Sequence, residues 1–427
     1  MPTMPDTLAL AAPALAWCRS QFPALSRMHA GRTVVYFDGP GGTQAPRCVI
    51  DAVSDYYERC NANSHGEFAS SRESDAIVDA AHQAVADLLG ADDPACVAFG
   101  PNMTTLTFAL SRALARTWKP GDEVIVTRLD HDANVAPWVL AARDAGATVR
   151  QVSFHHEDCT LNLDELRSML NGRTKLVAVG AAANVAGTVN PVADICRWSH
   201  AVGAQVFVDA VHFAPHARID VSAIGCDYLA CSAYKFFGPH VGVFWGRREL
   251  LESIEPYKLR PAPDDLPGRW MTGTQNFECI AGTLAAVDYL AGLGRQIRGV
   301  DANACDRRAA LDAAYNAIGA YERDLVARLL TGLRRIKPIR VYGITDLAQL
   351  DHRLPTVAFP HAAIKPAALA RHLNERGIFA WNGNCYALSC TESLGLEPEG
   401  VARVGMVHYN TAEEVDYLLQ VLDAGQW

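Results

Sequence analysis

The sequence predicts an α/β fold in which helices sandwich a mostly parallel sheet and a smaller α+β domain follows. Over residues 96–246, short apolar runs rich in β-branched residues alternate with segments of helical periodicity. That alternation is typical of parallel strands joined by helical crossovers. Beyond this region, Ala-, Leu- and Arg-rich segments with helical spacing take over. We therefore place a large domain at residues 36–295 and a small domain at residues 1–35 and 296–427.

Six short apolar runs are the predicted strands of the large domain. They are CVAFG at 96–100, EVIVT at 123–127, KLVAVG at 175–180, QVFVDA at 205–210, YLACS at 228–232 and GVFWG at 242–246. In an open sheet of this kind, ligands bind beyond the carboxyl ends of the strands. The polar residues that follow these runs are therefore candidates for a binding site.

The flanking segments predict the remaining elements. TLALAAPALAW at 7–17 lacks the basic stretch of a signal peptide and follows Asp6, so it predicts an N-terminal helix. The segment 307–336 has apolar residues at helical spacing and predicts one long helix or a helix pair. The small domain adds predicted strands IRVYGI at 339–344 and TVAFP at 356–360 and predicted helices at 365–377 and 411–425.

Composition restricts the partners and the compartment. A formal net charge of −9 argues against nucleic acid, because proteins that bind phosphate backbones concentrate Lys and Arg. The twelve cysteines form no CxxC pair, so we expect neither a metal site nor a disulfide framework, and a reducing cytoplasm is the simplest location. We see no run of about 20 apolar residues, the length that a membrane span needs, and expect no membrane partner.

Six motifs, in this order along the chain, carry a family resemblance. They are YFDGPGGTQAP at 36–46, GDEVIVTRLDHDANVAPW at 121–138, ANVAGTVNPV at 183–192, VFVDAVH at 206–212, CSAYKFFGPHVGVFWG at 231–246 and TGTQN at 272–276. Together they resemble the class V, fold-type I pyridoxal-phosphate enzymes, and most of all the cysteine desulfurase and selenocysteine lyase branch. The resemblance runs from about Tyr36 to Asn410. It implies a fold-type I transferase with a mostly parallel seven-stranded sheet and pyridoxal 5′-phosphate as cofactor.

The resemblance assigns the two central cofactor contacts. Lys235 is implied to form the Schiff base with the cofactor aldehyde. An ordinary lysine pKa of about 10.4 is too high for this, so the amine must be desolvated or lie near another cation. Asp209 is implied to pair with the protonated pyridine nitrogen, because a carboxylate at the end of a buried strand needs a cation. The ring would then act as an electron sink for a carbanion at the substrate's α-carbon.

Further positions complete the implied cofactor site. His131 matches a histidine that stacks on the ring and can transfer protons, since its ordinary pKa is near 6.5. Asn184 would bind the ring hydroxyl or the substrate, and His212 is a further cofactor contact. Backbone amides at a helix start attract phosphate. The phosphate contacts implied are Asn102, Met103, Thr104, Ser232, Tyr234 and Thr274, the last reaching a neighbouring subunit, which implies a homodimer with shared active sites.

The segment RGIFAWNGNCYALSC and Arg403 supply the implied substrate contacts. Arg403 matches the arginine that binds an amino acid's α-carboxylate bidentately. In related desulfurases, a catalytic cysteine lies in a loop that follows the first residues of this segment. Cys385 lies at or within one residue of that position. Cys390 is a second, weaker candidate. Trp381 and Tyr386 are predicted to line the pocket, favouring a larger or more apolar substrate than cysteine.

Two departures from the desulfurase pattern weaken the assignment of a substrate. Desulfurases usually have Ser-x-His-Lys where this chain has SAYK, so Tyr234 replaces the histidine before the lysine. They usually have glutamine at the position of His212. Kynureninases have a tyrosine and a histidine at these two places. The cofactor chemistry is unaffected, but the side chain of the substrate stays open.

The resemblance implies a pyridoxal-phosphate enzyme of the cysteine desulfurase-like type. It would cleave the Cβ–S bond of cysteine or a cysteine derivative through an external aldimine, with Lys235, His131 and Cys385 as catalytic residues. A sulfur acceptor is a candidate partner. A β-lyase, a kynureninase-like hydrolase, an epimerase and an aminotransferase stay open as alternatives. A non-enzymatic scaffold is disfavoured by the intact set of lysine, aspartate and arginine.

Overall fold

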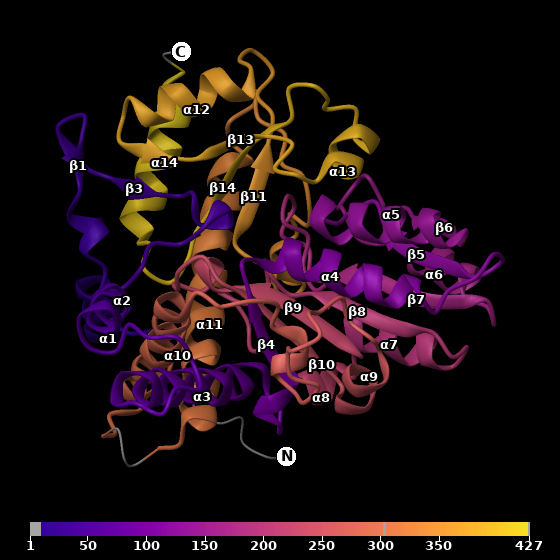
Figure 1. The fold of residues 1–427 in the computed structure, drawn as a ribbon. Coiled ribbons are helices and arrows are strands. Elements are labelled where there is room, and N and C mark those ends of the chain that lie inside the picture. Colours follow the sequence, from indigo (N-terminus) through magenta and orange to yellow (C-terminus); the bar gives the residue numbers. More distant parts are fainter. Residues whose placement is uncertain (1–9, 302–304, 426–427) are drawn as a thin grey trace, which may run out of the picture.

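The predicted α/β architecture is confirmed in the computed structural model, which describes residues 10–301 and 305–425 (Figure 1). The central sheet has seven strands in the order β4-β10-β9-β8-β7-β5-β6. Its strands are β4 (Val97–Gly100), β5 (Glu123–Thr127), β6 (Thr148–Val152), β7 (Thr174–Gly180), β8 (Gln205–Asp209), β9 (Tyr228–Ser232) and β10 (Gly242–Gly246). All neighbouring pairs are parallel except those that β10 makes with β4 and β9.

All six predicted strands of the large domain form, and the seventh strand of the central sheet, β6, was not predicted. Its segment TVRQV runs along the sheet edge and is mostly exposed or half-buried, with only Val152 buried. Strands at the centre of a parallel sheet are buried on both faces and read as continuous apolar runs. An edge strand needs no such run, so apolar composition does not reveal it.

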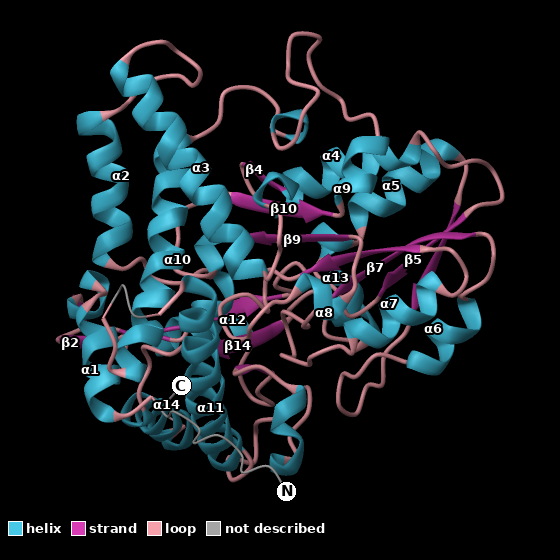
Figure 2. Ribbon diagram, turned by 90° about the horizontal axis from the view of Figure 1, so that it is seen from below, coloured by secondary structure: helices cyan, strands magenta, loops and turns pink. Residues whose placement is uncertain are grey.

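Helices cover both faces of this sheet. Figure 2 shows α4, α5 and α9 along one face and α6, α7 and α8 along the other. The helices of this part are α2 (Arg47–Arg59), α3 (Ala69–Leu89), α4 (Met103–Ala115), α5 (Ala136–Ala145), α6 (Leu163–Met169), α7 (Val192–His200), α8 (Val221–Ile224), α9 (Arg248–Ser253) and α10 (Phe277–Arg298). By length and composition, α10 could cross a membrane, but 67% of the apolar window is buried inside the fold, as in a core helix.

The smaller α+β unit is built on a three-stranded antiparallel sheet in the order β11-β14-β13. Its strands are β11 (Thr356–Phe359), β13 (Trp381–Gly383) and β14 (Val401–Gly405), and β12 (Ile378–Phe379) pairs with β3 (Val35–Tyr36). A hairpin joins β1 (Met28–His29) to β2 (Arg32–Thr33). The remaining helices are α1 (Ala12–Ser20), which packs against α10 in the core of the large sheet, and α11 (Arg307–Leu333), α12 (Pro366–Asn374), α13 (Leu388–Ser393) and α14 (Ala412–Ala424).

One predicted strand of this unit is wrong. The segment 339–344 makes only isolated bridges, from Ile339 to His361 and from Tyr342 to Ala358. Gly343 turns the chain there with a φ of 90°, a conformation outside the β region. The predicted N-terminal helix begins at Ala12, and residues 7–9 of the predicted span lie outside the described residues.

The segment 307–336 forms one long helix rather than a pair, and it joins the two apolar cores. The N-terminal half of α11 packs into the core of the large sheet through residues such as Leu311 and Ile318. Its C-terminal half packs into the core of the small sheet through residues such as Leu329 and Leu333. The two cores therefore share α11, while the boundary after residue 295 stays a prediction.

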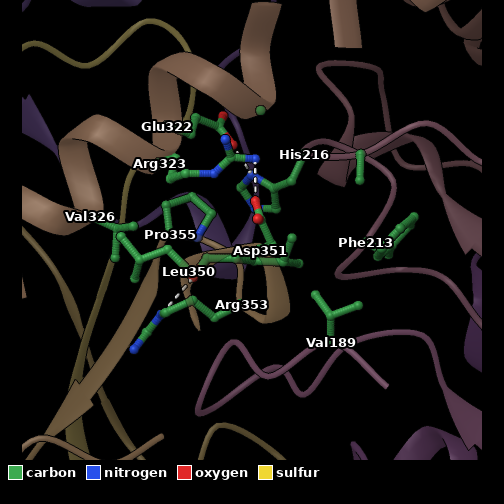
Figure 3. A pocket seen from close by; sticks show the side chains of 13 residues that line it. Val189, Phe213, His216, Glu322, Arg323, Val326, Leu350, Asp351, Arg353 and Pro355 are labelled. Atoms are coloured by element: carbon green, nitrogen blue, oxygen red, sulfur yellow. Dashed lines mark hydrogen bonds and ion pairs between the residues drawn. The ribbon is translucent and has the colours of Figure 1, made fainter. Parts of the chain in front are cut away.

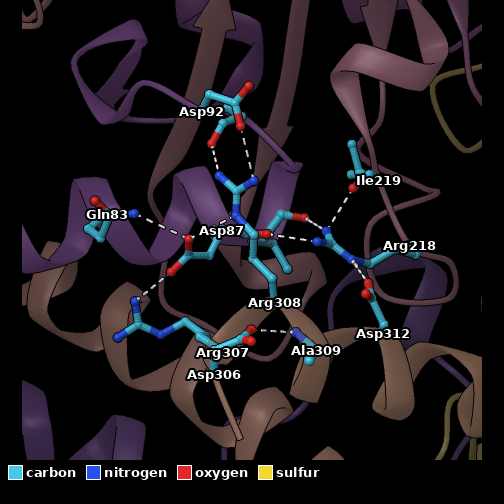
Figure 4. Close-up of polar contacts among 12 residues, drawn as sticks. Gln83, Asp87, Asp92, Arg218, Ile219, Asp306, Arg307, Arg308, Ala309 and Asp312 are labelled. Atoms are coloured by element: carbon cyan, nitrogen blue, oxygen red, sulfur yellow. Dashed lines mark hydrogen bonds and ion pairs between the residues drawn. The ribbon is translucent and has the colours of Figure 1, made fainter.

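An ionic cluster fastens the start of α11 to the end of α3 (Figure 4). Asp87 accepts hydrogen bonds from Arg307 at 2.9 Å and from Arg308 at 3.2 Å. Arg308 also pairs with Asp92 at 3.1 Å. The Asp87 side chain is 12% exposed, whereas that of Asp92 is 90% exposed. Because Asp87 is more desolvated than Asp92, its ion pair with Arg308 is stronger than the pair between Asp92 and Arg308.

We expect Asp87→Asn to lower the free energy of unfolding by about 1–3 kcal/mol, because two arginines lose a partly buried counter-ion. Asp92→Asn is the matched control, since it removes an exposed partner of the same Arg308. Urea denaturation followed by circular dichroism measures both. Equal losses of stability in the two variants would contradict this account of the junction.

Candidate active site

Polar residues gather where the central strands end, opposite β14 and the loop that precedes α13. His131 follows β5, Asn184 follows β7, and Asp209 ends β8. Lys235 ends the short helix η5 (Ala233–Lys235) directly after β9. These are the carboxyl ends of parallel strands, which is where a doubly wound sheet places its ligand.

Lys235 is the centre of this cluster. Its Nζ donates a hydrogen bond to the carbonyl of Pro40 at 2.6 Å and lies 5.2 Å from the centroid of the Tyr234 ring. Burial lowers the pKa of Lys235 to about 7, with Arg403 adding to the shift and Asp209 opposing it. Near neutral pH a large share of the amine is therefore unprotonated, and it can act as a nucleophile or a base.

One buried carboxyl group, Asp209, lies beside the lysine, and a second, Asp130, lies beside Asp209. Asp209 accepts a hydrogen bond from the Val211 amide at 2.8 Å, and burial raises its pKa to about 6. Asp130, which sequence reasoning missed, accepts from the Gly180 amide at 2.9 Å and from Asn134 at 3.1 Å. Burial and the charge of Asp209 raise the pKa of Asp130 to about 7. A buried cation beside Asp209 would restore its ordinary acidity.

Two histidines of the cluster are held neutral. Burial, Lys235 and Arg403 lower the pKa of His131 to about 4. Its Nδ1 accepts a hydrogen bond from the Ala133 amide at 3.0 Å. Burial lowers the pKa of His212 well below its usual range, and nearby cations add to the shift. Neutral imidazoles can donate or accept hydrogen bonds without adding charge.

Arg403 and Asn184 link the small sheet to the large one. Nη1 of Arg403 donates to the backbone carbonyl of Asn184 at 2.8 Å. The Asn184 side chain in turn donates to the backbone carbonyl of Cys385 at 2.8 Å. Nε of Arg403 and Oδ1 of Asn184 are buried without a hydrogen-bond partner. These atoms are therefore available to a bound molecule.

The loop with Cys385 is fixed from the large domain. Cys385 and Tyr386 have φ angles of 54° and 58°, in the left-handed region that costs non-glycine residues energy. The carbonyl of Tyr386 accepts from the Asp132 amide at 2.7 Å, and its ring stacks on His131 with centroids 5.5 Å apart. Burial raises the pKa of the Cys385 thiol, while Arg403 and Lys235 oppose the shift.

The other candidate residues near Cys385 are Tyr386, Trp381 and Cys390, and each has different surroundings. Tyr386 is 74% exposed and Trp381 is 48% exposed. Trp381 donates from Nε1 to the carbonyl of Asp38 at 3.1 Å, and a Cβ on Gly41 would lie 2.0 Å from that Nε1. Trp381 thus packs over the loop whose Pro40 binds Lys235. Cys390 is buried in α13, and its pKa is raised by burial and by Cys159, so it does not join the lysine cluster.

The start of α4 lies against the strand that leads to Lys235. Asn102 caps the helix by accepting from the Thr105 amide at 2.9 Å, and the Met103 amide donates to Ser232 Oγ at 3.0 Å. A Cβ on Gly242 would lie 2.4 Å from the backbone of Asn102, so glycine permits this approach. Burial raises the pKa of the Tyr234 phenol, and Ser232 opposes the shift. Exposed Thr104 completes the helix start.

Like Cys390, Thr274 is a predicted residue that the structure does not bring to the lysine cluster. It is exposed in the loop before α10 and makes no polar contact with the cluster within the described chain. Its predicted role requires a second subunit. Within residues 10–301 and 305–425, no group of three or more His, Cys, Asp or Glu side chains is arranged to hold a metal ion.

The donor set fits pyridoxal phosphate. The buried atoms without partners include His212 Nε2, Asn184 Oδ1 and Arg403 Nε, all at one site with the desolvated Lys235 amine and with Asp209. A carbonyl, a pyridine nitrogen, a ring hydroxyl and a substrate carboxylate are groups that these atoms would satisfy. The helix start beside Ser232 suits the phosphate.

Comparisons with known proteins agree with this geometry. The family model for aminotransferase class V matches residues 35–418. A probable cysteine desulfurase from Synechocystis sp. is 31% identical over 439 residues, covering 98% of this chain and 97% of that protein. A cysteine desulfurase from Dickeya dadantii is 29% identical, covering 94% of each chain.

Solved structures show the same fold. The apo structure of a cysteine desulfurase from Thermococcus onnurineus NA1 superposes with a TM-score of 0.83 at 25% identity, covering 96% of this chain and 97% of that one. The S-sulfonic acid form of the cysteine desulfurase CsdA from Escherichia coli gives a TM-score of 0.80 at 26% identity, covering 96% and 98%.

We expect Asn184→Ala to increase the rate at which iodoacetamide alkylates Cys385 severalfold, because the variant removes the side-chain hydrogen bond that fixes the loop. Peptide mass spectrometry of the alkylated protein measures this rate. Cys48 is exposed and serves as the internal control. An unchanged ratio of Cys385 to Cys48 labelling would mean that Asn184 does not hold the loop.

Proposed function

Because the chain belongs to the class V aminotransferase family, we propose that it is a pyridoxal-phosphate-dependent enzyme that cleaves the Cβ–S bond of cysteine or a cysteine derivative. The observation that carries this proposal is the desolvated Lys235 amine, which lies among Asp209, Arg403 and the Cys385 thiol. The names of the curated relatives support the same reaction class.

The residues of the cluster would hold the cofactor from several sides. Lys235 would bind it covalently, Asp209 would face the ring nitrogen, and His131 would lie against the ring. The start of α4 and Ser232 would hold the phosphate. When bound, the cofactor supplies an electron-withdrawing ring that stabilises negative charge at the substrate's α-carbon.

The remaining residues would act on the amino acid. The buried guanidinium of Arg403 would bind its α-carboxylate, aided by the free Oδ1 of Asn184 on the ammonium side. With a pKa of about 7, the Lys235 amine can take a proton from the α-carbon and return it. Cys385 would accept the sulfur atom, so that cysteine and a thiol give alanine and a persulfide.

A second outcome is favoured by the state of the thiol. Burial raises the pKa of Cys385, and a protonated thiol is a weak nucleophile. If the thiolate does not form, the same proton abstraction leads to β-elimination, with pyruvate, ammonia and hydrogen sulfide as the products from cysteine.

We also infer a homodimer with shared active sites. Large apolar side chains are exposed at Tyr57, Phe68, Tyr257 and Leu259, with exposed fractions of 54–66%. Such side chains on a soluble protein mark contact surfaces when they gather on one face. Thr274 lies in the same chain segment as two of them and would reach the partner's phosphate. The twelve free cysteines fit a reducing cytoplasm. The exposed side chain of Tyr386, next to Cys385, suits contact with a sulfur acceptor.

Borohydride reduction should fix the cofactor to Lys235 and to no other lysine. Lys235→Ala is expected to abolish the label, whereas Lys258→Ala should retain it, because the Lys258 amine is paired with Asp264 at 2.8 Å and lies outside the cluster. Peptide mass spectrometry locates the label. A label that persists in the Lys235 variant would place the covalent link elsewhere.

Cysteine turnover separates the two outcomes. The wild-type protein is expected to form alanine and a persulfide on Cys385, and Cys385→Ala should lose both products while retaining pyruvate formation. Cys390→Ala is the control, since Cys390 lies outside the cluster. Mass spectrometry of products and protein measures this. Alanine and persulfide at wild-type rates in the Cys385 variant would refute its role.

A further inference from the structure

A cavity lies behind the site, between the large sheet and α11 (Figure 3). Its volume is about 210 Å³, and its wall includes Val189, Phe213, His216, Glu322, Leu350 and Arg353. The short helix η8 (Leu347–His352) closes one side. An ion pair of 2.6 Å between Arg323 and Asp351, both partly exposed, lies at its rim. A cavity of this size has room for several water molecules.

A buried pair of titratable groups borders this cavity. Nδ1 of His216 lies 2.8 Å from Oε2 of Glu322, and their side chains are 3% and 2% exposed. Oε1 of Glu322 has no hydrogen-bond partner in the structure. Burial raises the pKa of Glu322, and His216 opposes the shift. Removing one partner of such a pair leaves an unsatisfied polar group in the interior.

His216 connects the pair to the cofactor site. The segment after β8 turns back on itself, with the His216 amide bonded to the Phe213 carbonyl at 3.0 Å. The rings of His212 and His216 are in edge-to-face contact, with centroids 5.7 Å apart. His212 has its Nε2 free and interacts electrostatically with Arg403, Lys235 and His131. His216 therefore contacts a site residue without belonging to the site.

Because His216 lines the cavity, packing alone does not fix the orientation of its ring. The His216 side chain is 3% exposed, so packing encloses most of it, but the residue also lines the cavity. The polar contact of its ring is the one with Glu322. If that contact is lost, the ring can rotate towards the cavity and withdraw from His212.

We propose that Glu322 and His216 form a positioning pair that holds His212 in the orientation in which it contacts the cofactor. The inference rests on the proposed function, because it assigns residues that support the same cofactor site. It also gives a reason for a histidine at position 212, since an imidazole can be aligned from behind by an edge-to-face neighbour. Supporting residues of this kind commonly change ligand affinity without touching the ligand.

The test measures cofactor affinity and apoprotein stability separately. We expect Glu322→Leu to weaken the affinity of the apoprotein for pyridoxal phosphate by on the order of tenfold and to change the visible circular dichroism of the bound cofactor. Glu322→Gln should keep both close to wild type, because its amide oxygen can still accept from Nδ1. Asp87→Asn is the matched control, since it removes another buried carboxylate that lies away from the site and should lower stability alone.

The outcomes are distinct. Equal affinity in wild type and Glu322→Leu, or an equal loss in the Leu and Gln variants, would overturn the proposal. If Glu322→Leu does not fold, His216→Phe keeps an aromatic ring at this position and removes Nδ1, and unchanged affinity in this variant would also overturn the proposal. Wild-type protein that binds no pyridoxal phosphate would instead contradict the proposed function itself.

Discussion

The protonation states in the site depend on the burial of one lysine amine, that of Lys235. The Lys235 amine is desolvated just after the end of a buried strand, and the charge of Arg403 adds to the free energy needed to protonate it. Only Asp209 and the Cys385 thiol oppose this, and burial also weakens the charge on both. The consequence is an amine that changes protonation near neutral pH. A positively charged His131 or His212 would add to the repulsion, which is consistent with both being held neutral.

The site depends on contacts between the two sheets. The backbone carbonyl of Asn184 receives Arg403 from β14, and its side chain holds the backbone of Cys385. The left-handed pair at Cys385 and Tyr386 is kept in place by these bonds and by Asp132. Strain of this kind persists only where surrounding structure fixes it. The shared helix α11, fastened at Asp87, holds the two cores in the arrangement that these bonds require.

Much of this arrangement could be predicted from the sequence. Central strands are apolar on both faces. Their apolar runs therefore predicted the strands themselves and placed four polar residues after them, namely His131, Asn184, Asp209 and Lys235. The edge strand β6 was missed because its exposed residues carry no such signal. Asp130 and the pair of His216 with Glu322 were also missed. His216 and Glu322 lie 106 residues apart. The role of a buried polar residue can be assigned only when its distant partner is known.

The most direct test of the account is the protonation of Lys235 itself. The measurement is an NMR titration of apoprotein labelled with ¹³C at lysine Cε, with the resonance assigned by its absence in Lys235→Ala. We expect a midpoint near pH 7, because burial lowers the pKa of Lys235 to about that value. A midpoint near the ordinary lysine value of 10.5 would show that the amine is solvated, and would contradict the central claim.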